Sequence, residues 1–232
     1  ARALIDMVMY HDKSAEPIAL KLAAIYLNFI TGIQREDGSF DNYKDFNRQL
    51  TPQNELVNLE DSNGRALWSL GFTLAHCEKL PLDLVQQAKK AWDKAVVHIH
   101  KVGSPRAIAY MLKGLYYYHL VHQEEDVKKS IVQLADKLLN HYHINSDEDW
   151  CWYEDYMTYA NNVLPEAMLF SFLATGDLKY KKIALVTFDF LLSHYFMKGE
   201  FSVISNRGWF VKGSHKNTYG EQPIEVATTI IT

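Results

Sequence analysis

Apolar residues recur every three or four positions in three long segments, which is the spacing of one face of an α-helix. In the first segment Ala88 and Trp92 lie one turn apart, while Asp83 and Lys90 fall on the opposite side. Each segment is therefore predicted to be an amphipathic helix that packs one face on a core. The three segments are residues 82–99, 127–139 and 178–192.

The helices predicted between these segments are apolar on nearly every side. They cover residues 62–77, 104–120 and 164–175. A helix without a polar face is buried all round. The alternation of buried and amphipathic helices predicts two concentric layers, with the buried helices inside.

The inner helices begin in a similar way, with a capping residue or a proline just before a charged residue. Serine is a favourable N-cap, and proline suits the first helical position because its missing N–H would have no partner there. The shared opening indicates repeated helical hairpins joined by loops of different length. The openings are SNGRA, SPRA, LPEA and QPIE, and ARAL at the start of the chain is a possible fifth copy.

Long insertions precede the inner helices, at residues 32–59, 140–162 and 198–220. Loops longer than about 15 residues in a compact domain are usually functional. We expect all of them to lie on one rim of an all-α fold, an α/α toroid of about four and a half hairpins that forms a single domain over residues 1–232. Because the last segment, IEVATTIIT, stops without a cap, we expect the chain to be a fragment of a longer toroid.

Composition excludes several classes of protein. The chain has 232 residues, is 48% hydrophobic and carries a formal charge of −4, so nothing in it favours nucleic acid as a partner. No apolar run approaches the ~20 residues needed to cross a bilayer. The start of the chain lacks the layout of a signal peptide, which predicts a cytoplasmic or already processed protein. Neither metal-ligand spacing nor a phosphate-binding or nucleophile motif is present, so no metal and no cofactor are expected.

The first of four candidate groups on the rim is QREDGSFDNY, residues 34–43. Gly38 is suited to a turn, Asp37 can cap that turn, and Phe40 and Tyr43 offer flat surfaces. We interpret the segment as a turn that places Phe40 beneath the rim. Its acidic spacing is incomplete for a calcium loop.

The second group is NLEDSNGRALW, residues 58–68. Glu60 and Asp61 are expected just before an inner helix, where carboxylates gain from the helix dipole, and Arg65 follows one turn later. Two interpretations stay open: capping with an Arg–carboxylate pair, or an ion pair on a cavity wall that orients a polar ligand.

The third and fourth groups place aromatic rings beside carboxylates and amides, as a sugar requires. A ring face can lie on an aromatic side chain while the hydroxyls find hydrogen-bonding partners. Two carboxyl groups across such a cleft could also act as acid and base on a glycosidic bond. The third group contains Trp152, Glu154, Tyr159, Asn161, Asn162 and Glu166, and the fourth contains Trp209, Tyr219, Glu221, Gln222 and Glu225.

Together the motifs LEDSNGRALWSLG, SPRAIAY, WCWYEDYMTYANNVLPEAML and GWF…YGEQPIEVA resemble a known family. It is the α/α-toroid domain of six-hairpin glycosidase type, which occurs alone or joined to bacterial glycosyltransferases. The resemblance implies a carbohydrate-active or carbohydrate-binding toroid. One departure is Ala160, where the family pattern has a polar residue.

The leading hypothesis is a protein that acts on or binds a glycan in a central cavity, most nearly a glycoside hydrolase. Glu154 is the candidate acid/base, with Glu60 or Asp61 across the rim. The candidate substrate-binding residues are Arg65, Trp68, Arg106, Trp152, Tyr159, Asn161, Glu166, Trp209, Gln222 and Glu225.

Two other functions stay open. One is a non-catalytic carbohydrate-binding or accessory module of a bacterial glycosyltransferase domain. The other is a sugar epimerase that uses a pair of histidines, although the histidines, His98 among them, are scattered along helices and helix ends. A terpene-cyclase-like toroid is disfavoured because the chain has neither a DxDD nor a DDxxD run.

Overall fold

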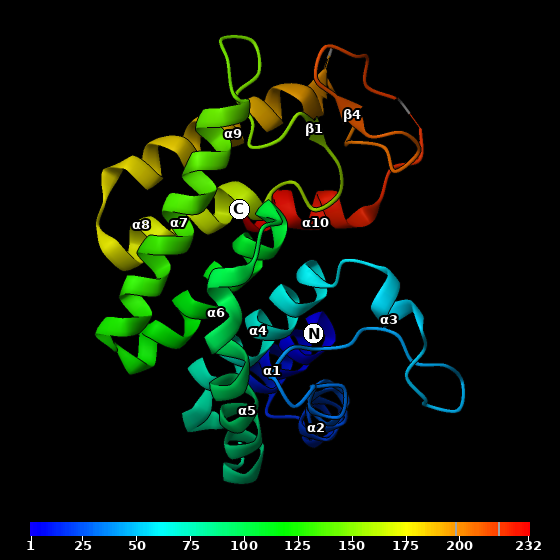
Figure 1. Cartoon of the computed structure of the whole chain (residues 1–232), viewed down its shortest axis with the longest axis vertical. Coiled ribbons are helices and arrows are strands. Elements are labelled where there is room, and N and C mark those ends of the chain that lie inside the picture. Colours follow the sequence, from blue (N-terminus) through cyan, green and yellow to red (C-terminus); the bar gives the residue numbers. More distant parts are fainter. Residues whose placement is uncertain (198, 218) are drawn as a thin grey trace. The chain divides into compact units, whose positions relative to one another are not determined.

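A computed structural model of the chain describes residues 1–197, 199–217 and 219–232 (Figure 1). The described residues are mostly helical and divide into two compact units, Ala1–Leu134 and Ala135–Thr232, here called unit 1 and unit 2. The prediction of an all-α chain is confirmed. Among the described helices, none has both the length and the apolar character that crossing a bilayer requires.

Unit 1 contains two layers of helices. Its elements are α1 (Arg2–Ser14), α2 (Pro17–Thr31), α3 (Gln53–Leu56), α4 (Glu60–Ala75), the 3-10 helix η1 (Cys77–Lys79), α5 (Leu82–Ala95), the 3-10 helix η2 (Val96–Lys101), α6 (Pro105–His122) and the first part of α7 (Glu125–Asn145). Helices α1, α4 and α6 form one layer. Helices α2 and α5 pack on each other to form the second, joined by hydrogen bonds from Gln87 Nε2 to Asn28 Oδ1 and Thr31 Oγ1.

Glycines let α4 and α6 run in parallel at close range. A methyl group built at Gly71 would lie 2.2 Å from the Gly114 carbonyl oxygen, and one at Gly64 would lie 2.8 Å from the Ala107 carbonyl oxygen. Because both contacts join residues at the same separation along the two helices, the helices point the same way. Helix α6 is buried continuously from Arg106 to Leu115, as its apolar sequence predicts.

Helices α1 and α2 of unit 1 show which helices the hydrophobic pattern predicts and which it does not. α1 lies beside α4, with an ion pair between Asp12 and Lys79 near their C-terminal ends. α2 buries Ala19, Ala23 and Leu27 at four-residue spacing, and this helix was not predicted from the sequence. Unit 1 thus has two packed layers of helices, and the predicted ring of inner and outer helices stays a prediction.

Unit 2 consists of the end of α7 and a helical hairpin, followed by a long irregular segment and a final helix. Its elements are β1 (Tyr156–Met157), α8 (Val163–Thr175), α9 (Leu178–Tyr195), β2 (Phe196–Met197), β3 (Glu200–Phe201), β4 (Phe210–Val211) and α10 (Pro223–Ile231). Gly176 ends α8 in a left-handed conformation with φ of 76°, and Asp177 caps α9 by accepting from the Lys179 N–H at 3.0 Å.

The long insertions contain short antiparallel pairings that hydrophobic periodicity does not reveal. β1 pairs with β4 so that Tyr156 lies opposite Val211, and β2 pairs with β3. In unit 1, isolated bridges join Gln34 to Phe40 and Lys44 to Leu50. These pairings fold the insertions back on themselves and fix the side chains described next.

Candidate functional site

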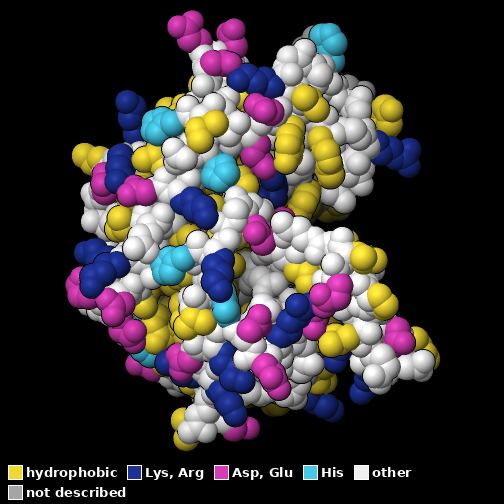
Figure 2. Space-filling model, viewed as in Figure 1, with side chains coloured by type: hydrophobic (Ala, Val, Ile, Leu, Met, Phe, Trp, Pro, Cys, Tyr) yellow, Lys and Arg dark blue, Asp and Glu magenta, His cyan; other side chains and the backbone are white. Residues whose placement is uncertain are grey.

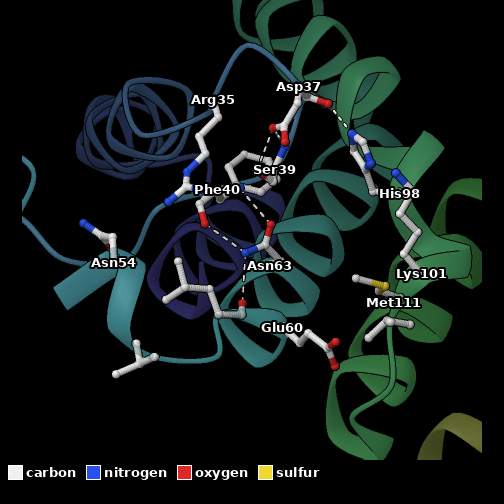
Figure 3. Close-up of a pocket in the computed structure, with 13 residues that line it drawn as sticks. Arg35, Asp37, Ser39, Phe40, Asn54, Glu60, Asn63, His98, Lys101 and Met111 are labelled. Carbon is white, nitrogen blue, oxygen red and sulfur yellow. Dashed lines mark hydrogen bonds between the residues drawn. The ribbon is translucent and has the colours of Figure 1, made fainter. Parts of the chain in front are cut away.

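A cavity of about 390 Å³ lies in unit 1, where the loop after α2 meets the start of α4 and the end of η2. Figure 3 shows His98 and Lys101 on one side of it, Arg35 and Asp37 on the loop, and Glu60 and Asn63 at the start of α4. The lining residues are Arg35, Asp37, Ser39, Phe40, Asn54, Val57, Leu59, Glu60, Asn63, His98, Lys101, Val102 and Met111.

The loop turns where the sequence predicts, around Gly38. This glycine has φ of +96°, and a methyl group there would lie 2.0 Å from the Lys94 carbonyl oxygen, so no side chain fits. Asp37 Oδ1 accepts from the Ser39 hydroxyl at 2.6 Å and the Ser39 N–H at 2.9 Å. These hydrogen bonds hold the pKa of Asp37 below its usual value. The ring of His98 donates to the Asp37 carbonyl from η2.

Asn63 ties this turn to α4. Its Oδ1 accepts from the Phe40 N–H at 2.7 Å, and its Nδ2 donates to the carbonyls of Phe40 and Leu59, both at 2.9 Å. Phe40 is 2% exposed, which confirms that the turn buries this ring. The network in Figure 3 therefore joins three segments into one wall of the cavity.

Glu60 and Asp61 lie in the first turn of α4, not just before it, because the helix begins at Glu60. Glu60 Oε2 accepts from the backbone N–H of Gly103 at 2.9 Å and of Ser104 at 2.6 Å. Asp61 Oδ1 accepts from the Ser104 hydroxyl at 2.6 Å. Both candidate catalytic carboxylates thus hold the start of α6, where acidic groups are favoured by unpaired amides. Their catalytic role stays a prediction.

The remaining candidates of unit 1 surround Tyr110 on α6. Trp68 stacks on its ring with centroids 5.7 Å apart, and the Arg65 guanidinium lies over it at 5.7 Å. The expected Arg65–carboxylate pair stays a prediction. The Lys113 ammonium lies 4.0 Å from the centre of the Trp68 ring. Arg106, at the start of the same helix, is 4% exposed.

In unit 2 the structure brings Asn161 and Glu225 together in a buried polar centre. Glu225 is 1% exposed and accepts from the Ala160 N–H, from the Asn161 N–H at 3.3 Å and from Asn161 Nδ2 at 3.2 Å. The Tyr195 hydroxyl donates to it at 2.5 Å. Burial raises the pKa of Glu225, and these hydrogen bonds oppose the rise.

Ala160 adopts a left-handed conformation in this centre, with φ of +50°. This conformation is uncommon outside glycine, asparagine and aspartate. Here it accompanies two successive backbone amides that donate to one carboxylate, the arrangement of an anion-binding nest. Ala160, one position at which the sequence departs from the pattern of the family that it resembles, thus lies in the turn that holds Glu225.

The other candidates of unit 2 are less closely grouped. Tyr159 and Trp209 pair with ring centroids 6.5 Å apart, and Trp209 is 42% exposed. Trp152 is fully buried, and Glu154 and Glu166 are buried at 8% and 4% exposure. Gln222 precedes the first residue of α10 and provides no side-chain cap. The expected meeting of all four groups on one rim stays a prediction, as do the binding roles of these residues.

The cavity of unit 1 contains groups that sequence reasoning did not select. Lys101 is exposed and forms no hydrogen bond or ion pair with any residue that the structure describes, so its ammonium is free to donate. Ser39 and Asn63 lie within the first two candidate groups but were not selected there, and only the long-range hydrogen bonding of the loop brings them to the wall. Within the described residues, no cluster of three or more His, Cys, Asp or Glu side chains could hold a metal ion.

Comparison with protein families and with curated proteins finds no relative of the chain. No model of a protein family matches the chain, and no match is found among curated proteins. The proposal below therefore rests on the residues of the cavity.

Proposed function

We propose that the protein binds a carbohydrate in the cavity of unit 1. The observation that carries this proposal is the mixed lining of a cavity of about 390 Å³, which falls within the usual range of ligand pockets. Lys101 offers a donor, Ser39 offers a hydroxyl, and Val57 and Met111 offer apolar surface. A sugar needs hydroxyl partners around its edge and apolar contact for its C–H faces.

The charges around the cavity favour a neutral sugar over a phosphorylated ligand. Arg35 is already engaged, because it donates to Asp41 Oδ1 at 2.8 and 2.5 Å and to Glu55 Oε1 at 2.9 Å. The remaining charged side chains include the cation of Lys101 and the carboxylates of Asp37 and Glu60. A phosphate would face both carboxylates, whereas a neutral hydroxyl can donate to either of them.

Binding is better supported than hydrolysis. Glycoside hydrolysis requires two carboxyl groups that face each other across the substrate. In this cavity one oxygen of Glu60 is occupied by two backbone amides, and Asp37 closes its own turn. These hydrogen bonds direct the carboxylates to the protein's own backbone, and no second carboxyl is shown facing them across a substrate.

The fold, the cellular location and the partner of the protein are part of the same proposal. The two layers of unit 1 are compatible with part of an α/α toroid of six-hairpin type, and the absence of a membrane-crossing helix among the described residues is compatible with the predicted cytoplasmic location. We infer an accessory role beside a bacterial glycosyltransferase domain, which would supply the transfer chemistry.

A printed array of neutral and acidic mono- to hexasaccharides tests the proposal directly. We expect the full chain to bind a subset of spots, and Lys101→Ala to weaken binding about tenfold, since a hydrogen bond from a charged donor is lost. Lys21→Ala is the matched control, because Lys21 is also exposed but lies on α2 outside the cavity.

The same array separates the alternatives. Wild-type protein that binds no spot would contradict the proposal. Shortened products in the supernatant, detected by mass spectrometry, would favour the glycoside hydrolase instead.

A further inference from the structure

A second cavity in unit 1 lies between the end of α2, the segment that follows this helix, and α5, which packs on α2 (Figure 1). Its volume is about 310 Å³, at the lower end of the range of ligand pockets. No Asp or Glu is among the described residues that line it, whereas Asp37 and Glu60 line the first cavity. The second cavity is lined by Thr31, Gln34, Gln87, Lys90, Ala91 and Lys94.

The two lysines of the second cavity lie one helical turn apart on α5. Residues four apart share one face of a helix, with Cβ atoms about 5–6 Å apart, so one small anion can contact both side chains. Neither Lys90 nor Lys94 forms a hydrogen bond or an ion pair with a residue that the structure describes. Asp93 is already engaged, because Lys89 donates to both of its carboxylate oxygens at 2.7 and 2.9 Å. The cavity therefore presents two ammonium groups without a counter-charge in its lining.

Hydrogen bonds hold the two amide side chains that form much of the remaining wall. Gln34 Nε2 donates to the carbonyls of Gly38 at 3.0 Å and Ala91 at 2.9 Å, and Gln87 Nε2 donates to Thr31 Oγ1 at 2.9 Å. The Oε1 atoms of both glutamines accept from no group that the structure describes. Each can therefore accept from a hydroxyl group of a ligand.

Neither helix stability nor a broad basic surface accounts for the pair of lysines. The helix dipole favours Lys94 in the last turn of α5, but Lys90 one turn earlier repels it, because like charges four residues apart destabilise a helix. Figure 2 shows Lys and Arg side chains interspersed with Asp and Glu on this face of unit 1, and the chain carries a formal charge of −4. A local pair of cations suits a small, doubly charged anion, whereas a nucleic acid requires an extended basic surface.

We propose that the second cavity binds a phosphate monoester of a small hydroxylated molecule, such as a sugar phosphate. The phosphate group carries about two negative charges at neutral pH and accepts from the ammonium groups of Lys90 and Lys94. The hydroxyl groups of the same molecule donate to the amide oxygens of Gln34 and Gln87. This site goes beyond the proposed function and does not depend on it, because the two cavities share no lining residue.

Isothermal titration calorimetry of the full chain with glucose-6-phosphate, in a buffer of low ionic strength, tests the site. We expect wild type to bind it more tightly than inorganic phosphate, and Lys90→Ala or Lys94→Ala to weaken binding about tenfold, since a charge-assisted hydrogen bond is lost. The double variant should show no measurable binding, and Lys94→Arg should retain it because the charge is kept. Lys21→Ala is the matched control, since it removes an exposed lysine of α2 that lies outside the cavity. Circular dichroism checks that each variant is folded.

Each other outcome has a distinct meaning. Wild type that binds neither phosphate would overturn this inference and leave glycan binding in the first cavity standing. Equal weakening by Lys21→Ala would overturn it as non-specific attraction, and weakening by Lys101→Ala alone would move the phosphate to the first cavity. Inorganic phosphate bound as tightly as glucose-6-phosphate would overturn the hydroxylated carrier. Binding only to vesicles that contain phosphatidic acid, lost in the double lysine variant, would assign the cavity to a lipid headgroup instead.

Discussion

Glu60 in unit 1 and Glu225 in unit 2 hold neighbouring backbone segments in the same way but differ in exposure to water. Glu60 accepts from the successive amides of Gly103 and Ser104, and Glu225 accepts from those of Ala160 and Asn161. Glu60 is half-buried and lines a cavity, whereas Glu225 is buried. Each lies in the first turn of its own helix.

This comparison shows that exposure to water distinguishes a carboxylate that only stabilises the fold from one that can also bind a ligand. The sequence alone does not distinguish these two roles. Glu225 has all its acceptor capacity directed into the protein, with the Tyr195 hydroxyl and the Asn161 amide as further donors. Glu60 has one oxygen in use and faces a space that a ligand can enter. A buried carboxylate such as Glu225 stabilises the fold, whereas a carboxylate that faces a cavity, such as Glu60, can also bind a ligand.

Replacing Glu225 with alanine should have the largest effect of the changes considered. It leaves the buried amides of Ala160 and Asn161 without an acceptor, and such losses cost about 4 kcal/mol in free energy of unfolding. Urea unfolding followed by circular dichroism measures the change. Glu221→Ala is the matched control, because the exposed Glu221 accepts, among the residues that the structure describes, from the Val203 N–H at 3.1 Å, and its loss should cost under about 1 kcal/mol. Equal effects of the two changes would contradict a structural role for Glu225.

Tyr195→Phe is a smaller change to the buried polar centre around Glu225. The change removes only the hydroxyl that donates to Glu225 at 2.5 Å and keeps the ring, which is fully buried. Hydrogen bonds to charged groups are worth about 2 kcal/mol, so we expect a loss of that size in the free energy of unfolding. Tyr180→Phe offers a comparison, because its hydroxyl donates at 2.8 Å to Asp136, which is about half exposed. A smaller loss at Tyr195 than at Tyr180 would argue against the importance of burial.

Glu60→Ala should be milder still. Water can reach the amides of Gly103 and Ser104 once the carboxylate is gone, so we expect a loss of about 1 kcal/mol, comparable to that of a helix cap. The same variant should weaken glycan binding on the array, whereas Glu225→Gln should not. Unchanged glycan binding by Glu60→Ala would remove Glu60 from the proposed site and leave it a purely structural residue, like Glu225.

Hydrophobic patterning predicted much of the fold. α4, α6 and α8 begin within two residues of the expected positions, because long apolar runs with a proline or a cap at the start leave few alternatives. Ser104 caps α6 as expected, and its hydroxyl accepts from the Ala107 N–H at 3.4 Å. The short strand pairs were not predicted, since two-residue strands carry no periodic signal.

The candidate site was predicted less well, for a physical reason. The groups that shape the cavity are brought together by hydrogen bonds across long sequence separations, such as Asn63 to Phe40 and His98 to Asp37. A single sequence shows the turn around Gly38 but not which distant side chain binds it. Lys101 resembles any other surface lysine, and only its place on the cavity wall distinguishes it.

The pH dependence of stability gives the smallest and most specific test of the comparison. Burial raises the pKa of Glu225, so the folded state holds the proton more tightly than the unfolded state does. The stability that this contributes is therefore present at low pH and is lost as pH rises through the folded-state pKa. Glu225→Gln removes the titration while keeping a carbonyl acceptor. We expect the free energy of unfolding of wild type, minus that of Glu225→Gln, to increase in urea titrations as pH falls through the folded-state pKa of Glu225.

Subtracting the variant removes the contribution of the other acidic groups, which titrate alike in both proteins. Tyr195→Phe should make the difference steeper, because the lost hydroxyl stabilises the charged carboxylate and its removal raises the pKa of Glu225 further. A flat or falling difference for Glu225 would mean that its four donors outweigh its burial, and the centre of unit 2 would then hold a stable buried anion.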